Sequence, residues 1–556
     1  MNWIKNSFQL SQILTFCFAL LFFSLVDAKD IPHLKQQGST FQLMVDGKPM
    51  LVRGGELGNS SASNLQYLGQ YWSKFKALNM NTVVAPVYWD LVEPEEGKFD
   101  FSLVDGLIKD AQKHDMKLVL LWFASWKNSM SSYCPEWVKI DTKRFPRSRD
   151  RNGQAFEILS PFHPENYQAD ARAFASLRAH IKKVDKHQVV IMLQPENEVG
   201  MVEHARDYSD KATELYHSQV PQKFISYLLE NKSHLTPKLR NAWALSNFRT
   251  SGNWVEIFAD SPQTEEFFMA WYFAQYTHHV AQAGKQEYPL PMFVNAALIR
   301  PGYQPGQYIS AGPLPHLIDI WRAAGPAIDF IAPDIYFPNF TYWTERYTQS
   351  GNPLFIPEAL RNNDASVNAL YAIAEHSAMG FSPFGIESIE EVAGALLSQS
   401  YDLLAQLEPL ILAHQGKPTM RGFLQISDQQ KAPQQIRLGK YEMQVKFEYA
   451  PPPSLANGVI NESGDISRGP KMPSGGLVIQ LSENEFIFAG IGITITFDSL
   501  MANQQAGIVS AQSGRFEQGK WQNLLWNNGD QTHQGRHVRI EPGQFGIQKV
   551  KLYRYN

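Results

Sequence analysis

The sequence predicts an α/β fold in which a (β/α)8 TIM barrel is followed by a C-terminal antiparallel β-sandwich domain. Two observations lead to this prediction. Between residues 50 and 387, short runs that are apolar on both faces alternate with longer helical stretches, as parallel strands covered by helices do. After Gly416, short stretches of alternating apolar and polar residues replace this pattern, which is typical of antiparallel strands with one buried face.

Eight apolar runs are expected to form the strands of the barrel. The helix expected after the first run carries an apolar stripe at helical spacing, at Leu65, Leu68, Trp72 and Phe75. A doubly wound sheet is the alternative, but "RGGELG" lacks the glycine spacing of a phosphate-binding turn. The eight runs are Met50–Glu56, Asn81–Val87, Lys117–Phe123, Gln188–Gln194, Pro291–Ala296, Asp329–Tyr336, Pro353–Glu358 and the weaker Met379–Glu387.

The second domain is expected over residues 417–556. In "YEMQVKFEY" (Tyr441–Tyr449), Tyr, Met, Val, Phe and Tyr alternate strictly with Glu, Gln, Lys and Glu. Similar short runs follow, separated by Gly, Pro and Asn, as in a β-sandwich. The helical stretch Glu391–Ala413 closes the barrel, so we assign residues 29–416 to the catalytic domain.

Residues 1–28 have the pattern of a secretory signal peptide. Lys5 precedes the apolar run Ile13–Val26, and cleavage is expected after Ala28. The run is too short for a convincing membrane span, although an uncleaved anchor is the alternative. We therefore expect a secreted or periplasmic protein without a stable membrane span after cleavage. Cys134 would then be the only cysteine, so no intrachain disulfide is expected.

Composition excludes several classes of partner and cofactor. The formal net charge is -4 and no basic run occurs, so binding to nucleic acid has no electrostatic support. The histidines show no metal-binding spacing such as HExxH, so metal catalysis is not expected. We expect no cofactor, and the sequence does not indicate an oligomeric state.

Two of the predicted strands end in glutamate. "IMLQPENEVG" (Ile191–Gly200) carries Glu196, Asn197 and Glu198 at the end of the fourth strand, and Glu358 ends the seventh. The active sites of such barrels lie at this end of the strands. Cleavage of a glycosidic bond needs one protonated carboxyl and one ionised carboxylate around the anomeric carbon. The sequence therefore predicts a pair of carboxyl groups with these two roles.

Spacing alone does not decide between Glu196 and Glu198. Side chains two residues apart on a strand share a face, so either is a candidate for the acid. We assign Glu198 as general acid/base and Glu358 as nucleophile. Asn197, which precedes the acid, is expected to contact the 2-hydroxyl group of the sugar.

Several motifs resemble those of the family 35 glycoside hydrolases. They are "GGELGNS", "NTVVAPVYWDLVEPEEGKFDF", "QPENEVG" and "FIPEAL", which together cover roughly residues 40–390. The resemblance implies a retaining β-galactosidase whose second glutamate of "ENE", here Glu198, is the acid. It also implies that the glutamate ending strand seven, here Glu358, is the nucleophile. "LLWFASWKNSM" departs from the usual family pattern after strand three.

Further substrate-binding residues are expected around this pair. Trp126 and Asn128 are candidates to replace the missing family elements, and Trp126 would either stack on the sugar ring or fill a loop. Tyr88 is expected to reach galactose hydroxyls, with packing at the barrel top as its alternative role. Tyr336 is expected to hydrogen-bond the nucleophile, and an ordinary buried tyrosine is the alternative. Glu56 matches the family's glutamate on the first strand, and a structural salt bridge is its alternative role.

The predicted function is that of an exo-acting retaining β-galactosidase. Its carbohydrate substrate would carry terminal β-galactose on an oligosaccharide or on a polysaccharide side chain. One alternative is a related barrel glycosidase of other specificity, such as a β-mannosidase or an endo-galactanase. Another is a catalytically inactive carbohydrate-binding protein.

Overall fold

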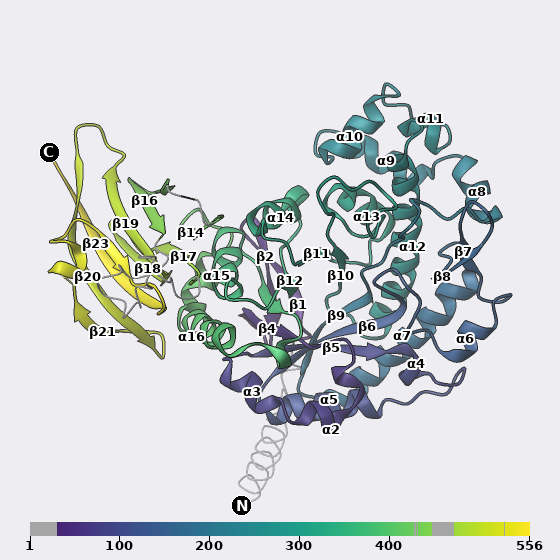
Figure 1. The fold of residues 1–556 in the computed structure, drawn as a ribbon, viewed down its shortest axis with the longest axis horizontal. Helices are drawn as coiled ribbons and strands as arrows, with labels where there is room; N and C mark the ends of the chain where they lie inside the picture. The colour runs from purple at the N-terminus through teal and green to yellow at the C-terminus, as the bar shows by residue number, and fades with distance from the viewer. Residues whose placement is uncertain (1–29, 428–429, 431, 448–471, 528) are drawn as a thin grey trace, which may run out of the picture.

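The computed structural model describes residues 30–427, 430, 432–447, 472–527 and 529–556 (Figure 1). The predicted signal peptide, residues 1–28, lies outside this part of the chain. Within the described ranges, every helix is too short or too polar to span a membrane.

A closed ring of eight parallel strands confirms the predicted barrel. β9 and β10, at the two ends of the hydrogen-bonded order, are joined by a parallel bridge between Leu193 and Met292, which closes the ring. The doubly wound alternative, an open sheet, is therefore wrong. In ladder order the strands are β10 (Phe293–Ala297), β11 (Phe330–Ile335), β12 (Ile356–Ala359), β13 (Gly380–Pro383), β4 (Val52–Glu56), β5 (Thr82–Tyr88), β6 (Lys117–Lys127) and β9 (Val190–Asn197).

Helices cover the outside of the barrel because each carries an apolar stripe. In α5 (Ser102–Lys113) the buried residues are Val104, Leu107, Ile108 and Ala111, which recur at the spacing of one helix face. Other helices around the ring include α2 (Leu65–Gly69), α3 (Trp72–Ala77), α4 (Trp89–Val92), α7 (Pro164–Val184), α12 (Pro262–Glu287), α13 (Ile318–Ala324), α14 (Phe340–Tyr347), α15 (Ala365–Glu375) and α16 (Glu391–His414).

Three additions to the barrel were not predicted from the sequence. A three-stranded antiparallel sheet precedes the first barrel strand, and a small two-stranded sheet follows β6. A group of short helices is inserted between β9 and α12 and forms one end of the molecule in Figure 1. These elements are β1 (His33–Gln37), β2 (Thr40–Val45) and β3 (Lys48–Met50), then α6 (Glu136–Ile140), β7 (Arg147–Arg149) and β8 (Ala155–Leu159), and finally α8 (Asp210–His217), α9 (Gln222–Glu230), α10 (Pro237–Ala244) and α11 (Trp254–Phe258).

The C-terminal domain is a sandwich of two antiparallel sheets, as predicted. Tyr441, Met443 and Val445 on β16 are all buried between the sheets, as their alternation with polar residues requires. In the described residues, one sheet has the order β14 (Met420–Leu424), β17 (Gly475–Gln480), β18 (Glu485–Ile491), β23 (Gly546–Tyr555), β20 (Gln505–Glu517) and β21 (Lys520–Trp526). The other has the order β15 (Gln434–Leu438), β16 (Tyr441–Phe447), β19 (Ile493–Ser499) and β22 (Val538–Ile540).

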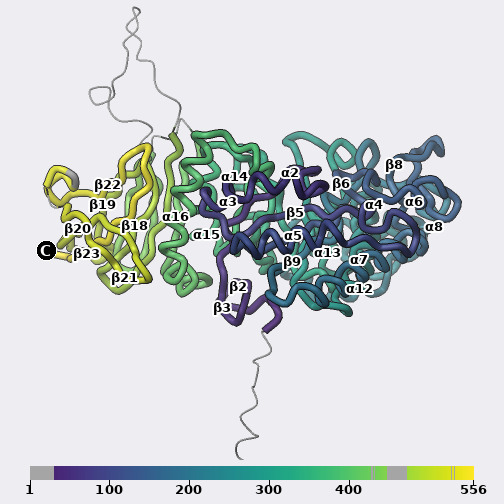
Figure 2. Tube along the Cα trace, turned by 90° about the horizontal axis from the view of Figure 1, so that it is seen from below, coloured from purple at the N-terminus to yellow at the C-terminus, as the bar shows by residue number. Residues whose placement is uncertain are grey.

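The outer face of the six-stranded sheet packs against the barrel helices α15 and α16 (Figures 1 and 2). Leu477 and Ile479 of β17 belong to the same hydrophobic cluster as the barrel core. Arg421 of β14 forms a two-pronged ion pair with Glu375 at the end of α15, at 2.9 and 2.7 Å. These contacts place the sandwich beside barrel strands β12 and β13.

Candidate active site

Four carboxyl groups converge at the carboxyl end of the barrel. Glu56 ends β4, Asp334 lies on β11, Glu358 lies on β12, and Glu198 follows β9 directly. Asp334 and Glu358 are direct neighbours in the β11–β12 ladder. All four side chains are nearly excluded from solvent, and the greatest exposure is 5% at Glu198. The predicted pair therefore lies in one buried acidic cluster with two further carboxyl groups.

Glu198 is held by the backbone and by Asn295 of β10. The φ angle of Glu198 is 46°, a left-handed conformation that is uncommon for residues other than glycine. Its backbone N–H donates to the Asn295 side chain at 3.0 Å, and the Asn295 amide nitrogen donates to Asp334 at 2.7 Å. Asn295 of β10 thereby connects Glu198, at the end of β9, with Asp334 on β11.

Burial, and then the charge of Glu358, raise the pKa of Glu198 to about 7. Lys127 and a hydrogen bond with Asp334 act in the opposite direction and lower this pKa. Near neutral pH the Glu198 carboxyl is therefore partly protonated. A group with this property can donate a proton and later accept one.

Glu358 is surrounded by groups that favour its ionised form. Burial raises the pKa of Glu358 above its usual value, and Lys127 and hydrogen bonds from Tyr336 and Glu56 limit this rise. The Tyr336 hydroxyl donates to Glu358 Oε1, so the contact expected for this tyrosine is present. More hydrogen bonds lower the pKa of Glu358 than that of Glu198, which favours Glu358 as the ionised member of the pair.

The surroundings of the two remaining carboxyl groups favour their protonated forms. Burial and the charge of Glu358 raise the pKa of both Glu56 and Asp334 well above the usual range. Each also forms a hydrogen bond with a second carboxyl group, Glu56 with Glu358 and Asp334 with Glu198. Two ionised carboxylates cannot share a hydrogen bond, so each pair requires a proton. Glu56 thus lies beside Glu358 and within the field of Lys127, and its role toward substrate stays a prediction.

Lys127 supplies the positive charge of the cluster and was missed in the sequence analysis. It ends β6, pairs with Asn197 in the β6–β9 ladder, and is 7% exposed. Its ammonium group lies 5.0 Å from the centre of the Phe123 ring. The charge of Lys127 lowers the pKa of Glu56, Glu198 and Glu358. Lys127 thus opposes the negative charge that these carboxyl groups carry when they ionise.

Glu196 belongs to a different cluster. Its Oε2 accepts a hydrogen bond from the backbone N–H of Trp126 at 2.8 Å, and its carboxyl group hydrogen-bonds with Asp170 of α7. Burial and then Asp170 raise its pKa well above the usual range. Its φ of 65° interrupts the alternation of the strand. Glu196 thus faces the helix layer, and Glu198 faces Glu358.

Asn197 lies between the two glutamates and is fully buried. Neither atom of its side-chain amide has a hydrogen-bond partner within the described part of the chain. A buried amide without partners is costly, which makes Asn197 unusual in this barrel. Its contact with the 2-hydroxyl group of a sugar stays a prediction.

The prediction that Trp126 stacks on a sugar ring is wrong. Its side chain is fully buried and packs edge-on against Phe273 and Tyr276, at ring-centre distances of 5.3 and 4.5 Å. The ring therefore has no face open to a ligand. Asn128 follows β6 on the surface with a φ of 51°. Its contact with substrate stays a prediction.

Tyr88 lies at the end of β5 but is engaged in packing. Its hydroxyl donates to the backbone carbonyl of Asn59 at 2.8 Å. Its ring stacks on Tyr133 at a centre distance of 5.5 Å, and the side chain is 4% exposed. In this structure Tyr88 shapes the barrel top, and a contact between it and a sugar stays a prediction.

A cavity of about 440 Å³ opens over the acidic cluster. Glu198, Asp334 and Tyr336 line it, together with Arg300 and Tyr308 from the segment after β10. Its volume lies within the usual range for small-ligand sites, about 300–1,000 Å³. The described residues contain no group of three or more His, Cys, Asp and Glu side chains arranged to hold a metal ion.

Comparison with protein families indicates similarity to β-galactosidases over part of the barrel. A glycoside hydrolase family 42 model, described as beta-galactosidase, matches residues 64–279, which include Lys127 and Glu198. The matching model is thus of family 42, and the family 35 resemblance is not confirmed. A domain of unknown function, DUF5597, matches residues 397–539, from within α16 into the sandwich.

Individual relatives are distant. A β-galactosidase of Xanthomonas manihotis is 28% identical over 183 residues, which are 30% of this chain and 27% of that protein. The chain therefore spans about a quarter of the length of this curated relative. Among solved structures, β-galactosidases of Rahnella sp. R3 and Bacillus circulans sp. alkalophilus each share 16% identity. Their TM-scores are 0.46 and 0.44, with 68% and 65% of this chain and 58% and 57% of those chains covered.

Proposed function

We propose that this chain is an exo-acting retaining β-galactosidase that removes terminal β-galactosyl residues by double displacement. The observation that carries the proposal is the contrast between two buried carboxyl groups in one acidic cluster. Glu198 has a pKa of about 7 and can hold a proton, whereas three neighbours favour the ionised form of Glu358. This is the division of labour that a glycosidase needs.

In the first step, Glu358 attacks the anomeric carbon as Glu198 gives its proton to the leaving-group oxygen. The glycosidic C–O bond breaks and a glycosyl ester forms on Glu358. In the second step, the ionised Glu198 takes a proton from water, whose oxygen attacks the anomeric carbon. The ester bond breaks, β-galactose is released, and Glu198 is protonated again.

The surrounding residues have roles that follow from their contacts. Tyr336 and protonated Glu56 hold the Glu358 carboxylate in one orientation through their hydrogen bonds. Asn197, whose amide has no partner among the described residues, would bind the 2-hydroxyl group, a contact that strengthens in the transition state. The choice of galactose rests on the similarity of residues 64–279 to the β-galactosidase family model.

The same proposal includes export of the protein. The apolar run Ile13–Val26 and the following Ala28 support a cleavable signal peptide and a secreted or periplasmic location. Sequencing the N-terminus of the protein recovered from the periplasm or medium tests this. A mature chain that begins near Lys29 is expected, and an intact Met1 in the purified protein would contradict it.

A panel of nitrophenyl glycosides tests the activity. The β-galactoside is expected to be hydrolysed at least tenfold faster in kcat/KM than the β-mannoside, β-glucoside and β-xyloside. NMR of the first product should show β-galactose before mutarotation. Preference for the mannoside, or activity on internal galactan bonds alone, would favour the alternative glycosidases. Binding of galactose without any turnover would favour an inactive binding protein.

A further inference from the structure

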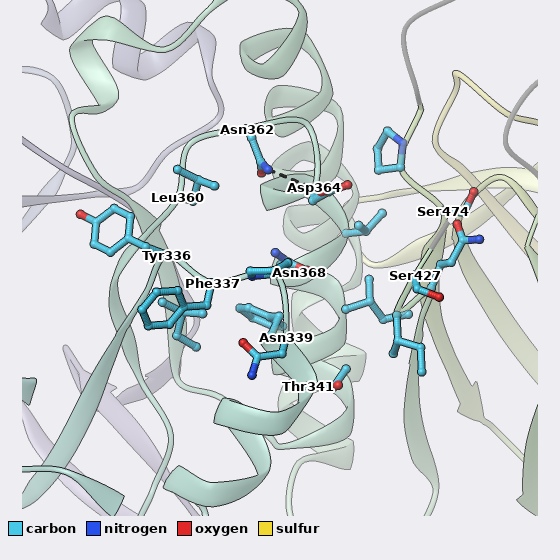
Figure 3. Close-up of a pocket in the computed structure, with 18 residues that line it drawn as sticks. Tyr336, Phe337, Asn339, Thr341, Leu360, Asn362, Asp364, Asn368, Ser427 and Ser474 are labelled. Atoms are coloured by element: carbon cyan, nitrogen blue, oxygen red, sulfur yellow. Dashed lines mark hydrogen bonds between the residues drawn. The ribbon is translucent and has the colours of Figure 1, made fainter. Parts of the chain in front are cut away.

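A second cavity, of about 600 Å³, lies where the barrel meets the sandwich (Figure 3). Its barrel side is formed by the loop that follows β11 and by the start of α15. Its sandwich side is formed by Leu424 at the end of β14, by residues 425–427 after it, and by Pro473 and Ser474, which precede β17. The cavity therefore exists only because the two domains are packed together.

This interdomain cavity adjoins the acidic cluster. Tyr336 and Phe337 line both the interdomain cavity and the cavity that contains Glu198 and Asp334. The Tyr336 hydroxyl is bonded to Glu358, and 37% of the residue is exposed. In Figure 3 its ring points away from the asparagines of the interdomain cavity. One short loop thus borders the reaction centre on one side and the interdomain cavity on the other.

The lining of the interdomain cavity is polar and almost uncharged. Asn339, Asn362 and Asn368 contribute side-chain amides, and Asp364 is the one charged group among the described residues that line the cavity. The buried Nε2 atom of Gln425, on the sandwich side, has no hydrogen-bond partner within the described residues. Amide groups donate and accept at once, which suits sugar hydroxyls. The Phe337 ring adds an apolar surface.

We propose that the interdomain cavity binds the neutral oligosaccharide to which the terminal galactose is attached. The inference rests on the proposed function, because it needs galactose to occupy the pocket above Glu198 and Glu358. The leaving group then extends past Tyr336 and Phe337 toward Asn368 and Gln425. A bound anionic chain is disfavoured, since Asp364 is present and the described residues that line the cavity include no lysine or arginine.

Under this proposal the sandwich domain contributes to substrate binding. Gln425 and Ser474 belong to the sandwich, and Asn362 and Asn368 belong to the barrel. A substrate that reaches the interdomain cavity therefore contacts both domains, whereas a small aryl galactoside contacts the barrel alone. The enzyme is expected to prefer galactose on a longer neutral chain.

Three substrates and four proteins test the proposal. The substrates are nitrophenyl β-galactoside, a neutral galactosylated oligosaccharide and a galactosylated oligosaccharide of uronic acids. The proteins are the unchanged chain, Asn368→Ala, Asn368→Trp and the control Asn523→Trp, an exposed position on the outer strand β21. The measured quantity is the ratio of kcat/KM for each oligosaccharide to that for the aryl galactoside.

For the unchanged chain, the ratio is expected to be higher for the neutral than for the acidic oligosaccharide. Asn368→Ala should lower the neutral ratio about threefold to tenfold, as the loss of one hydrogen bond does. Asn368→Trp, which fills the interdomain cavity, should lower it further, and Asn523→Trp should leave it unchanged. Turnover of the aryl galactoside reports whether each variant is folded.

The outcomes separate the two proposals. If no protein hydrolyses the aryl galactoside or the oligosaccharides, the proposed function fails. If the aryl galactoside is hydrolysed and both Asn368 variants keep the original ratio, the proposed function stands and the oligosaccharide site is overturned. A preference for the acidic oligosaccharide would also overturn the assignment of a neutral ligand.

Discussion

Glu196 and Glu198 are two residues apart at the end of β9, yet their carboxyl groups lie in separate environments. Glu196 bonds to the Trp126 backbone and to Asp170 of the helix layer. Glu198 lines the cavity at the barrel mouth and senses the charge of Glu358. Both residues have positive φ angles, so the backbone is forced out of the regular strand at the point where chemistry is proposed.

This relationship provides a matched pair of variants for the acid role. Glu198→Gln removes the proton donor, and kcat/KM should fall about 10²-fold to 10⁴-fold on substrates with poor leaving groups. Aryl galactosides with activated leaving groups should be affected much less. Glu196→Gln keeps an acceptor for the Trp126 N–H and a donor for Asp170, so its activity should stay within a few-fold of the original.

Steady-state kinetics over a series of aryl leaving groups checks this prediction. For Glu198→Gln, log kcat/KM should depend more steeply on the leaving-group pKa than for the unchanged protein. An equal loss on good and poor leaving groups would argue against Glu198 as the acid. A large loss in Glu196→Gln with normal folding would reopen the choice between the two glutamates.

The pH dependence of activity should be bell-shaped. Glu198 must be protonated in the first step, and its pKa is about 7, so kcat/KM should fall as the pH rises above about 7. Glu358 must be ionised, so kcat/KM should also fall at acidic pH as this carboxylate gains a proton. Measurement of kcat/KM between pH 4 and 9 on one aryl galactoside checks both limbs. A profile that stays flat up to pH 9 would contradict the assignment of Glu198.

Replacement of Lys127 should move this profile to higher pH. Its positive charge lowers the pKa of Glu198 and Glu358, so Lys127→Met should raise both values and shift both limbs upward, by roughly one pH unit. Activity below the optimum should fall because less Glu358 is ionised. Lys113→Met, at the exposed end of α5, controls for the loss of one charge. An unshifted profile in active Lys127→Met protein would remove Lys127 from the electrostatics of the site.

Much of the fold follows from the sequence because its apolar runs are strong and regular. Each of the eight predicted runs contains or overlaps one barrel strand, from β4 at Val52–Glu56 to β13 at Gly380–Pro383. The alternation around Met443 likewise indicates a sandwich strand. The helices between β9 and α12 lie outside this repeating pattern, so periodicity did not reveal that they form an insertion.

The candidate site follows less completely from the sequence. Glu358 and Glu198 could be chosen because they end buried strands, but the direction of Glu196 depends on a φ angle that strand alternation does not reveal. Within "LLWFASWKNSM" the sequence indicated Trp126 and Asn128 as substrate-binding candidates. Lys127, which lies between them, is the residue whose positive charge lowers the pKa of Glu358. The sequence feature that could have indicated Lys127 is a lysine at the end of a long apolar strand.

Asp334 and Asn295 were missed for a related reason. Each lies within an apolar strand, β11 or β10, where a polar residue is unusual. Their importance depends on the hydrogen bond between them, 2.7 Å long, which joins residues from different strands. A single sequence contains the residue types but not their pairing across the barrel.

The most direct test of the proposed chemistry is covalent labelling of the nucleophile. A 2-deoxy-2-fluoro-β-galactosyl fluoride should inactivate the enzyme and leave one sugar per chain, because the fluorine slows hydrolysis of the glycosyl ester. Peptide mass spectrometry should place that sugar on Glu358, and Glu358→Gln protein should take up none. A label on Glu56 or Asp334, or rapid turnover with no label at all, would contradict Glu358 as the nucleophile opposite Glu198.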